Sequence, residues 1–230
     1  MTCLPGERTV GTVCLLHGGF WRVPYGPEQF DLVADDLARQ SFAVWSIGYR
    51  RVGETGGGWP GTADDVEAAL DLLPQVTASL GVDLGRVFVI GHSAGGQLAL
   101  SVVPALVTLF AVIGLAPISD LALAFRLGLG RNAVGEFIGG SPDEFPDRYS
   151  AASPFARPRQ AVSRMIVHGR MDEAVPLDMS RTYVQSRKRL GEDISYHEVE
   201  DAGHLDFLNP RSSVHTLMVS WISSRLSGYQ

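Results

Sequence analysis

The sequence predicts an α/β fold, a three-layer αβα sandwich in which a mostly parallel sheet of about six strands lies between two layers of helices. Six short apolar runs rich in Val and Ile alternate with segments of helical period. The runs are uniformly apolar, as expected of parallel strands that are buried on both faces. The length of 230 residues fits one such unit, so we expect a single domain over residues 1–230.

The predicted elements alternate along the chain. The predicted strands lie at residues 9–16, 42–47, 86–90, 110–115, 164–168 and 194–199. The predicted helices lie at residues 27–39, 64–73, 94–106, 178–190 and 213–226. Strands separated by helices in this way are typical of a parallel sheet, because each return crossing needs a helix.

One connection is much longer than the others. Residues 119–163 are rich in Gly, Pro and aromatic residues and predict only short helical pieces, at 121–127, 132–138 and 143–150. A long excursion at the carboxyl end of a strand usually forms a lid or a binding loop. We therefore expect a small lid at residues 119–163, with an ordinary surface insertion as the alternative.

Charge and cysteine content bear on the class of protein. The formal net charge of −6 argues against a nucleic-acid partner, because such proteins usually carry a basic patch. The two cysteines, Cys3 and Cys14, do not suggest a disulfide framework. The first residues show no cationic start followed by a long apolar segment, so we expect a cytoplasmic protein.

Residues 87–119 carry no formal charge, which fits either a buried region or a membrane span. An apolar stretch longer than about 18 residues is a candidate for a membrane span. This stretch contains several glycines, two prolines, His92 and Gln97, and is better explained as a strand, a sharp turn, a helix and a second strand. We therefore expect a buried region and no membrane contact.

The strongest functional signal is the pentapeptide GHSAG at residues 91–95, directly between a predicted strand and a predicted helix. In this context the pattern G-x-S-x-G is typical of a nucleophile on a tight strand-to-helix turn. Glycines let the neighbouring backbone approach the turn without a clash, and the serine points outward above the sheet. We predict that Ser93 is a catalytic nucleophile.

A serine nucleophile needs a base, and the base needs an acid that orients it. His204 follows the last predicted strand, on a loop that can reach the serine, and is the candidate base. Asp172 follows the strand at 164–168 and is the candidate acid, while Asp120, after the preceding strand, is the alternative. The other five histidines are interpreted as structural.

The negative oxygen of a tetrahedral intermediate requires hydrogen-bond donors. The backbone N–H of Ala94 is one candidate for this oxyanion hole, and those of Gly19 and Phe20, in the loop HGGFWR at 17–22, are the others. Aromatic side chains are candidates for substrate binding, with ordinary core packing as the alternative reading. These candidates are Trp21, Tyr25, Trp59 and Phe137.

Four segments, HGGFW, GHSAGG, GRMDEAVP and AGHLDF, occur in the order found in the α/β-hydrolase superfamily, which the chain resembles over most of its length. The pair HGGFWR and GHSAGG is similar to the kynurenine formamidase (arylformamidase) branch and related bacterial carboxylesterases. The resemblance implies a serine hydrolase that cleaves a small-molecule ester or aryl formamide through an acyl-enzyme, with no metal or organic cofactor. Thioester hydrolysis, peptide hydrolysis and a non-catalytic binding protein are the alternatives.

The resemblance also sets an expectation for the sheet. The superfamily fold opens with an antiparallel hairpin ahead of the strand that leads to HGG, but only 16 residues precede His17 here. We therefore expect six parallel strands in the order 2-1-3-4-5-6, without the hairpin. The second strand would then be an exposed edge that invites pairing, so we expect a homodimer through this edge or a covering segment.

Overall fold

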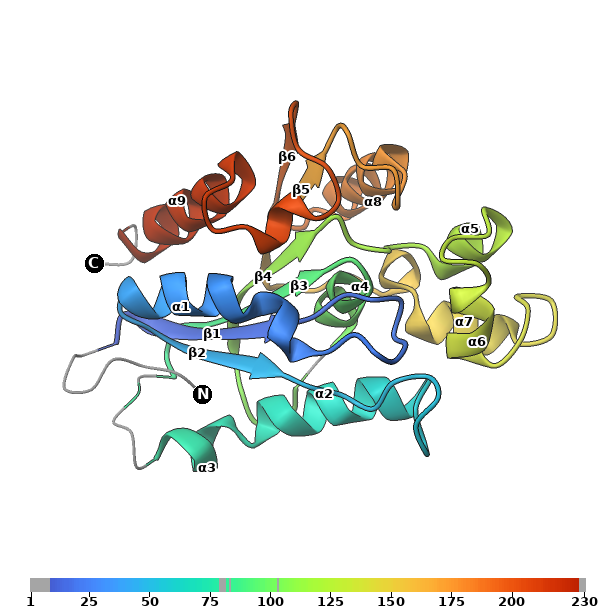
Figure 1. Cartoon of the computed structure of the whole chain (residues 1–230), viewed down its shortest axis with the longest axis horizontal. Coiled ribbons are helices and arrows are strands. Elements are labelled where there is room, and N and C mark those ends of the chain that lie inside the picture. The colour runs from blue at the N-terminus through green and yellow to red at the C-terminus, as the bar shows by residue number, and fades with distance from the viewer. Residues whose placement is uncertain (1–8, 79–81, 83, 103, 228–230) are drawn as a thin grey trace.

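All strands of the sheet run in the same direction (Figure 1). The computed structural model describes residues 9–78, 82, 84–102 and 104–227, and within them it contains one six-stranded sheet of order β2-β1-β3-β4-β5-β6. The strands are β1 (Gly11–Leu16), β2 (Phe42–Ile47), β3 (Val87–His92), β4 (Leu109–Leu115), β5 (Ser163–Gly169) and β6 (Ile194–Val199). The expected strand order and direction are confirmed.

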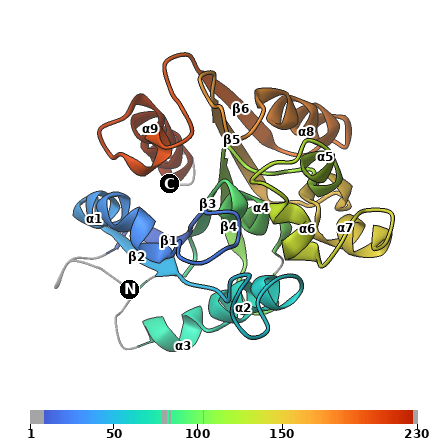
Figure 2. The same ribbon diagram turned by 45° about the vertical axis from the view of Figure 1, so that its right-hand side comes forward.

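Helices cover both faces of the sheet, as Figures 1 and 2 show. One face carries α1 (Asp31–Arg39) and α9 (Ser213–Ser227), with η1 (Pro27–Phe30) and η3 (Asp206–Leu208) beside them. The other face carries α2 (Gly61–Asp71), α3 (Leu73–Thr77), α4 (Ala94–Ser101) and α8 (Leu177–Arg189). Each face has its own buried apolar core, so the predicted three-layer sandwich is confirmed.

The uncharged stretch at residues 87–119 forms the centre of the molecule. Every residue of β3 and of α4 is buried, and the second half of β4 is buried as well. An unpaired charge in such surroundings would lose its hydration without compensation, which explains why the stretch has none. Within the described residues, no helix has the length and apolarity needed to cross a membrane.

Three helices differ clearly from the predicted bounds, and the one predicted at 27–39 is divided into η1 and α1. α4 ends at Ser101, before the predicted end at residue 106, and Val102 is already extended with φ −68° and ψ 143°. Pro104 explains this end, because proline has no N–H for the carbonyl four residues earlier and its ring clashes there. The helix predicted at 64–73 begins earlier, at Gly61, and a separate helix, α3, takes over where Pro74 stands in its first turn.

Residues 119–163, called the insertion below, contain α5 (Leu121–Arg126), α6 (Ala133–Ile138), α7 (Pro146–Ala152) and η2 (Pro154–Ala156). The helices α5, α6 and α7 lie beyond the carboxyl ends of the strands, on the right of Figure 1, before the chain returns to the amino end of β5. Its three α-helices lie close to the short predicted ones. Its role as a lid stays a prediction.

The sheet has two edges, β2 and β6. The edge position of β2 agrees with the sequence, and pairing of a second copy along β2 stays a prediction. Cys14, in the middle of β1, is fully buried, and burial raises the pKa of its thiol to about 12, so it is an inert core residue. Cys3, and a covering segment ahead of residue 9, lie outside the described residues.

Candidate active site

Three of the candidate residues lie at the same edge of the sheet. Ser93 directly follows β3, Asp172 follows β5 and His204 follows β6. Because the strands are parallel, their carboxyl ends meet at one edge, and the loops that leave them converge there. The fold therefore brings together side chains that are far apart in the sequence.

Ser93 lies in a strained turn. Its backbone has φ 56° and ψ −116°, a conformation that costs a non-glycine residue about 1–3 kcal/mol. A Cβ on Gly91 would lie 2.1 Å from the carbonyl oxygen of Gly95, and a Cβ on Gly95 would lie 2.1 Å from that of Leu16. The turn therefore requires glycine on both sides of the serine, as the sequence pattern predicts.

His204 joins the serine to the acid. Its Nε2 lies 3.0 Å from Ser93 Oγ, and its Nδ1 lies 2.7 Å from Asp172 Oδ2. The other carboxylate oxygen, Oδ1, accepts the backbone N–H groups of Ala174 at 2.8 Å and Val175 at 2.9 Å. The side chain of Asp172 is fully buried, whereas that of His204 is 16% exposed, so the imidazole forms the boundary between core and solvent.

These contacts determine where the protons lie. An ionised carboxylate only accepts, so Nδ1 of His204 carries a proton, and Nε2 accepts the hydroxyl proton of Ser93. Burial alone would raise the pKa of Asp172, but hydrogen bonds from His168 and His204 outweigh it and hold that pKa well below its usual range. The arrangement has the geometry of a nucleophile, a base and an orienting acid.

Asp120, the alternative acid, has a different contact. Its Oδ1 accepts the backbone N–H of Leu123 at 2.9 Å and caps the first turn of α5. A carboxylate in this position stabilises a helix start, because the first N–H groups of a helix have no partner within it. Of the two carboxylates, it is Asp172 that contacts His204.

The loop that follows β1 packs against the serine. A Cβ on Gly18 would lie 3.3 Å from Cβ of Ser93, and the next two residues, Gly19 (φ 94°) and Phe20 (φ 55°), have left-handed backbone. The backbone N–H groups of Gly19, Phe20 and Ala94 have no hydrogen-bond acceptor among the described residues. Unpaired N–H groups next to a nucleophile are the donors that an oxyanion requires.

Arg22 fastens this loop to the insertion. Its guanidinium donates to the Glu136 carboxylate at 2.6 Å and to the carbonyl oxygens of Gly130 and Arg131 at 2.7 and 3.0 Å. The ring of Phe20 packs on Gly130, where an added Cβ would lie 2.4 Å from it. The candidate oxyanion loop and the insertion are therefore held together by one side chain with three partners.

Trp21 and Phe137 are buried, which does not fit their predicted contact with substrate. Their exposed fractions are 0% and 1%, and their rings stack with centroids 4.3 Å apart. Nε1 of Trp21 also donates to Oε1 of Gln97 on α4 at 2.9 Å. This packing joins the loop, α4 and the insertion. Tyr25 is exposed and Trp59 half-buried, and their contact with substrate stays a prediction.

Two histidines that the sequence suggested were structural lie against these residues. Nε2 of His92 donates to the carbonyl oxygen of His204 at 2.8 Å. Burial, together with the nearby His204, lowers the pKa of His92 to about 3, so its ring is neutral at neutral pH. Nε2 of His168 lies 3.3 Å from Asp172 Oδ2. His168 precedes Asp172 by four residues, at the end of β5, and this short spacing is the sequence signal for the contact between the two side chains.

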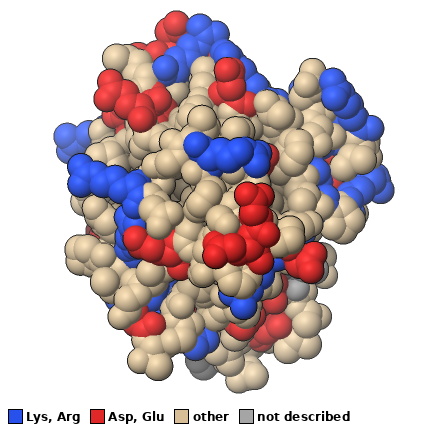
Figure 3. All heavy atoms as spheres, turned by 90° about the vertical axis from the view of Figure 1, so that its right-hand side faces the viewer, with Lys and Arg blue, Asp and Glu red and all other residues tan. Residues whose placement is uncertain are grey.

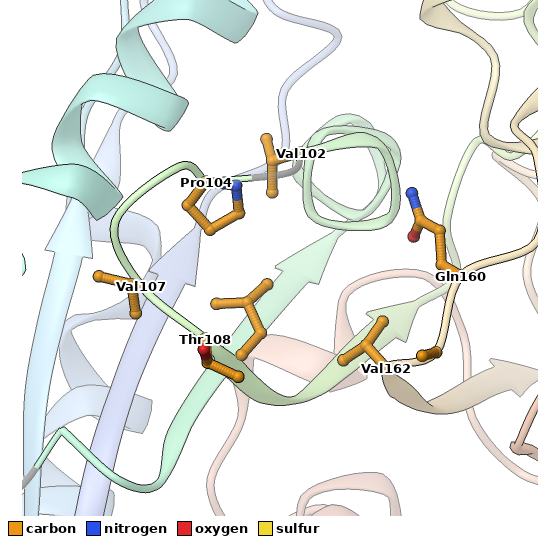
Figure 4. A pocket seen from close by; sticks show the side chains of 8 residues that line it. Val102, Pro104, Val107, Thr108, Gln160 and Val162 are labelled. Carbon is orange, nitrogen blue, oxygen red and sulfur yellow. The ribbon is translucent and has the colours of Figure 1, made fainter.

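An apolar cavity of about 410 Å³ lies away from these residues (Figure 4). Leu109 and Val162 in its wall stand at the amino ends of β4 and β5, which is the opposite edge of the sheet from Ser93. None of the candidate site residues lines it. Across the part of the chain that the structure describes, no three His, Cys, Asp or Glu side chains form a group that could hold a metal ion.

A model of the prolyl oligopeptidase family matches residues 60–227, which is more than half of the chain. The chain belongs to the prolyl oligopeptidase family. This family member is thus a hydrolase. A second model, BD-FAE, matches residues 4–103. No curated protein matches the sequence.

Solved structures show the same α/β-hydrolase fold as this prolyl oligopeptidase family member. A bifunctional GH43-CE protein of Bacteroides eggerthii has a TM-score of 0.80 and 19% identity, over 96% of this chain and 35% of that one. A truncated carbohydrate esterase from gut microbiota has a TM-score of 0.81 and 18% identity, over 97% and 88%. The esterase Est2 of Thermogutta terrifontis has a TM-score of 0.75 and 23% identity, over 98% and 85%. This chain therefore spans only about a third of the length of the bifunctional GH43-CE protein.

Removal of the Arg22 guanidinium is expected to loosen the junction between loop and insertion. In Arg22→Ala, the backbone amides of α6 should exchange about tenfold faster with deuterated water. The same is expected for the amide of Trp59, which donates to Phe137, and for that of Val52, which donates to Trp21. Hydrogen-exchange mass spectrometry measures this change. Arg39→Ala, at the exposed end of α1, is the matched control. Equal protection of α6 in both variants would contradict the expectation.

His92 is expected to make stability depend on pH. Its pKa falls from 6.5 in the unfolded chain to about 3 in the folded protein, because of burial, so between these values protons bind only the unfolded form. Stability should therefore decrease as pH falls below 6.5, by up to about 2 kcal/mol between pH 7 and pH 5. In His92→Gln this part of the decrease should vanish. Urea unfolding at the two pH values tests it, and an unchanged difference would refute it.

Proposed function

We propose that this protein is a serine hydrolase that cleaves a carboxylic ester or an aryl formamide of a small substrate. The observation that carries the proposal is the position of His204, whose ring nitrogens lie 3.0 Å from Ser93 Oγ and 2.7 Å from Asp172 Oδ2. A nucleophile, a base and an orienting acid in hydrogen-bond contact are the requirements of acyl transfer through a covalent intermediate. The names of similar structures, which include several esterases, support the same reaction class.

In the first half of the proposed reaction, Ser93 Oγ attacks the carbonyl carbon while His204 Nε2 takes its proton. The imidazolium that forms is stabilised by the buried carboxylate of Asp172. The negative oxygen of the tetrahedral intermediate accepts hydrogen bonds from the N–H groups of Gly19, Phe20 and Ala94. His204 then gives its proton to the departing alcohol or amine, which leaves an acyl-enzyme.

In the second half, water replaces the leaving group. His204 Nε2 takes a proton from this water, whose oxygen attacks the acyl carbon. A second oxyanion forms against the same N–H groups and collapses to release the carboxylic acid, while His204 returns the proton to Ser93 Oγ. Because Asp172 holds the proton on Nδ1, Nε2 is unprotonated at the start of both halves.

The insertion is proposed to form a wall of the substrate site. Arg22 hydrogen-bonds it to the loop whose N–H groups are the candidate oxyanion donors, which supports this position. Figure 3 shows the face that carries the insertion: basic and acidic side chains are intermixed there around uncharged surface. A face without one dominant sign of charge fits a small substrate of low charge better than a polyanion.

Peptide hydrolysis is the second candidate. The match to the prolyl oligopeptidase family favours it, because that family is named for a peptidase activity. The same nucleophile and base serve esters, thioesters and peptides, and the three differ in the leaving group that His204 must protonate.

Replacement of the serine is expected to abolish turnover. Ser93→Ala should lower kcat for an activated aryl ester by at least about 10⁴-fold, because the attacking oxygen is lost, with an unchanged melting temperature. Ser223→Ala, on the outside of α9, is the matched control and should retain full activity. An organophosphonate should also add its mass to the Ser93 peptide. Full activity of Ser93→Ala would refute the assignment.

A panel of substrates distinguishes the candidate reactions. We expect kcat/KM for N-formylkynurenine at least equal to that for short aryl acetates if the arylformamidase branch is right. A strong preference for acetate esters would instead indicate a carboxylesterase, and a preference for proline-containing peptide anilides would indicate a peptidase. The measurement is steady-state kinetics on all of these substrates and on longer acyl esters, at one pH and one protein concentration.

A further inference from the structure

His168 is a fully buried histidine that the proposed mechanism does not use. It lies near the end of β5, four residues before Asp172, and no part of its side chain is exposed. Its Nε2 lies 3.0 Å from the carbonyl oxygen of Val175 and 3.3 Å from Asp172 Oδ2. Its Nδ1 lies 2.7 Å from Oγ of Ser180 on α8. Both ring nitrogens thus have partners in a space without water access.

The partners of His168 determine which nitrogen carries the proton. The carbonyl of Val175 only accepts hydrogen bonds, so Nε2 carries the proton and donates it there, with Asp172 Oδ2 3.3 Å away from the same nitrogen. In this neutral tautomer Nδ1 has a free lone pair, and it accepts the hydroxyl proton of Ser180. Ser180 therefore fixes the tautomer that turns an N–H group toward the carboxylate.

The carboxylate of Asp172 accepts three hydrogen bonds, and the ring of His168 lies beside it. Two backbone N–H groups bind Oδ1 and Nδ1–H of His204 binds Oδ2, whereas Nε2 of His168 lies 3.3 Å from the same Oδ2. Donors to one oxygen compete for the same negative charge, and in a buried site water does not dilute this competition. The contact from His168 therefore weakens the attraction of Asp172 for a second proton on His204.

We propose that His168 is a positioning residue: its Nε2–H, 3.3 Å from Asp172 Oδ2, stabilises the ionised carboxylate and keeps His204 unprotonated, and therefore active as a base, at lower pH than it would otherwise be. This role rests on the proposed function, because it matters for catalysis only if His204 is the base. The geometry favours this role over simple core packing, because both ring nitrogens are used and one contacts the acid directly.

The other groups around Asp172 do not change charge in the pH range over which His204 is titrated. The titratable side chains that face Asp172 are His168 and His204, and His92 of β3 lies against His204. His92 has a pKa of about 3, because burial disfavours its charged form, so it stays neutral over the pH range in which the test is made. Ser180, the contact from α8, carries no charge.

The experiment compares four variants of the full chain. His168→Leu keeps the volume and removes the N–H group, His168→Gln keeps an N–H donor, and Ser180→Ala removes the group that fixes the tautomer. His215→Leu is the matched control, because His215 is also buried and also paired with a carboxylate, Asp36 at 2.8 Å, but on α9 and with no contact to the site. Melting temperatures show which variants are folded.

The main measurement is NMR titration of ¹⁵N-labelled histidine, which follows the His204 ring without substrate. We expect the midpoint of that titration to move up by about one pH unit in His168→Leu, since the loss of an N–H group beside a buried charge is of that order. The acid limb of kcat/KM for an activated ester should move by the same amount. His168→Gln should restore both, Ser180→Ala should give a smaller move in the same direction, and His215→Leu should give none.

The proposal is overturned if folded His168→Leu titrates like the wild type, or if folded His168→Gln moves as far as His168→Leu. A move of the same size in His215→Leu would also overturn it, because the effect would then be a general loss of stability. If His168→Leu does not fold, an unchanged titration in Ser180→Ala is the overturning result. Absence of all ester and formamide hydrolysis would refute the proposed function, whereas the NMR titration would still decide the role of His168.

Discussion

The close approach of α4 to β1 and β3 at Ser93 is the constraint on which the rest of the site depends. No side chain fits at Gly91 or Gly95, and the serine, whose φ is positive, has its peptide groups hydrogen-bonded on both sides. The N–H of Ser93 donates to Leu115 at 2.9 Å, and its carbonyl accepts the N–H of Gln97 at 3.1 Å. The hydroxyl is therefore positioned by backbone that belongs to three different elements, and the imidazole and the N–H donors are arranged around it.

Negative charge in the site is concentrated on one buried carboxylate. Asp172 carries it, and the groups around it are imidazole rings and backbone N–H groups that stabilise it without a formal positive charge. A buried carboxylate with several donors stays ionised, as the lowered pKa of Asp172 indicates. The neutral His92 donates a hydrogen bond to the backbone carbonyl oxygen of His204. The site thus contains one buried formal charge and otherwise neutral polar groups. This agrees with residues 87–119, around Ser93, which carry no formal charge.

Much of this arrangement could be predicted from the sequence because it depends on local patterns. Uniformly apolar runs indicate buried parallel strands, and the glycines around Ser93 indicate a turn that only they permit. The positions of Asp172 and His204 after successive strands indicate that they reach the same edge. Other features depend on which surfaces meet in three dimensions, and residue type alone does not show this. Trp21 and Phe137 have the composition of a pocket wall but stack on each other in the core, and His168 is a core residue by pattern but touches the acid.

The junction at Arg22 has a consequence for how such proteins diversify. An insertion that only bordered the site would be free to change length and sequence while the groups that stabilise the reaction stayed as they were. Here the same short loop supplies the candidate oxyanion donors and, through Arg22 and Trp21, the attachment of the insertion. Exchange of residues 119–163 for a segment from a related enzyme would therefore have to include the loop at 17–22, and the two form one module for recombination in evolution or in the laboratory.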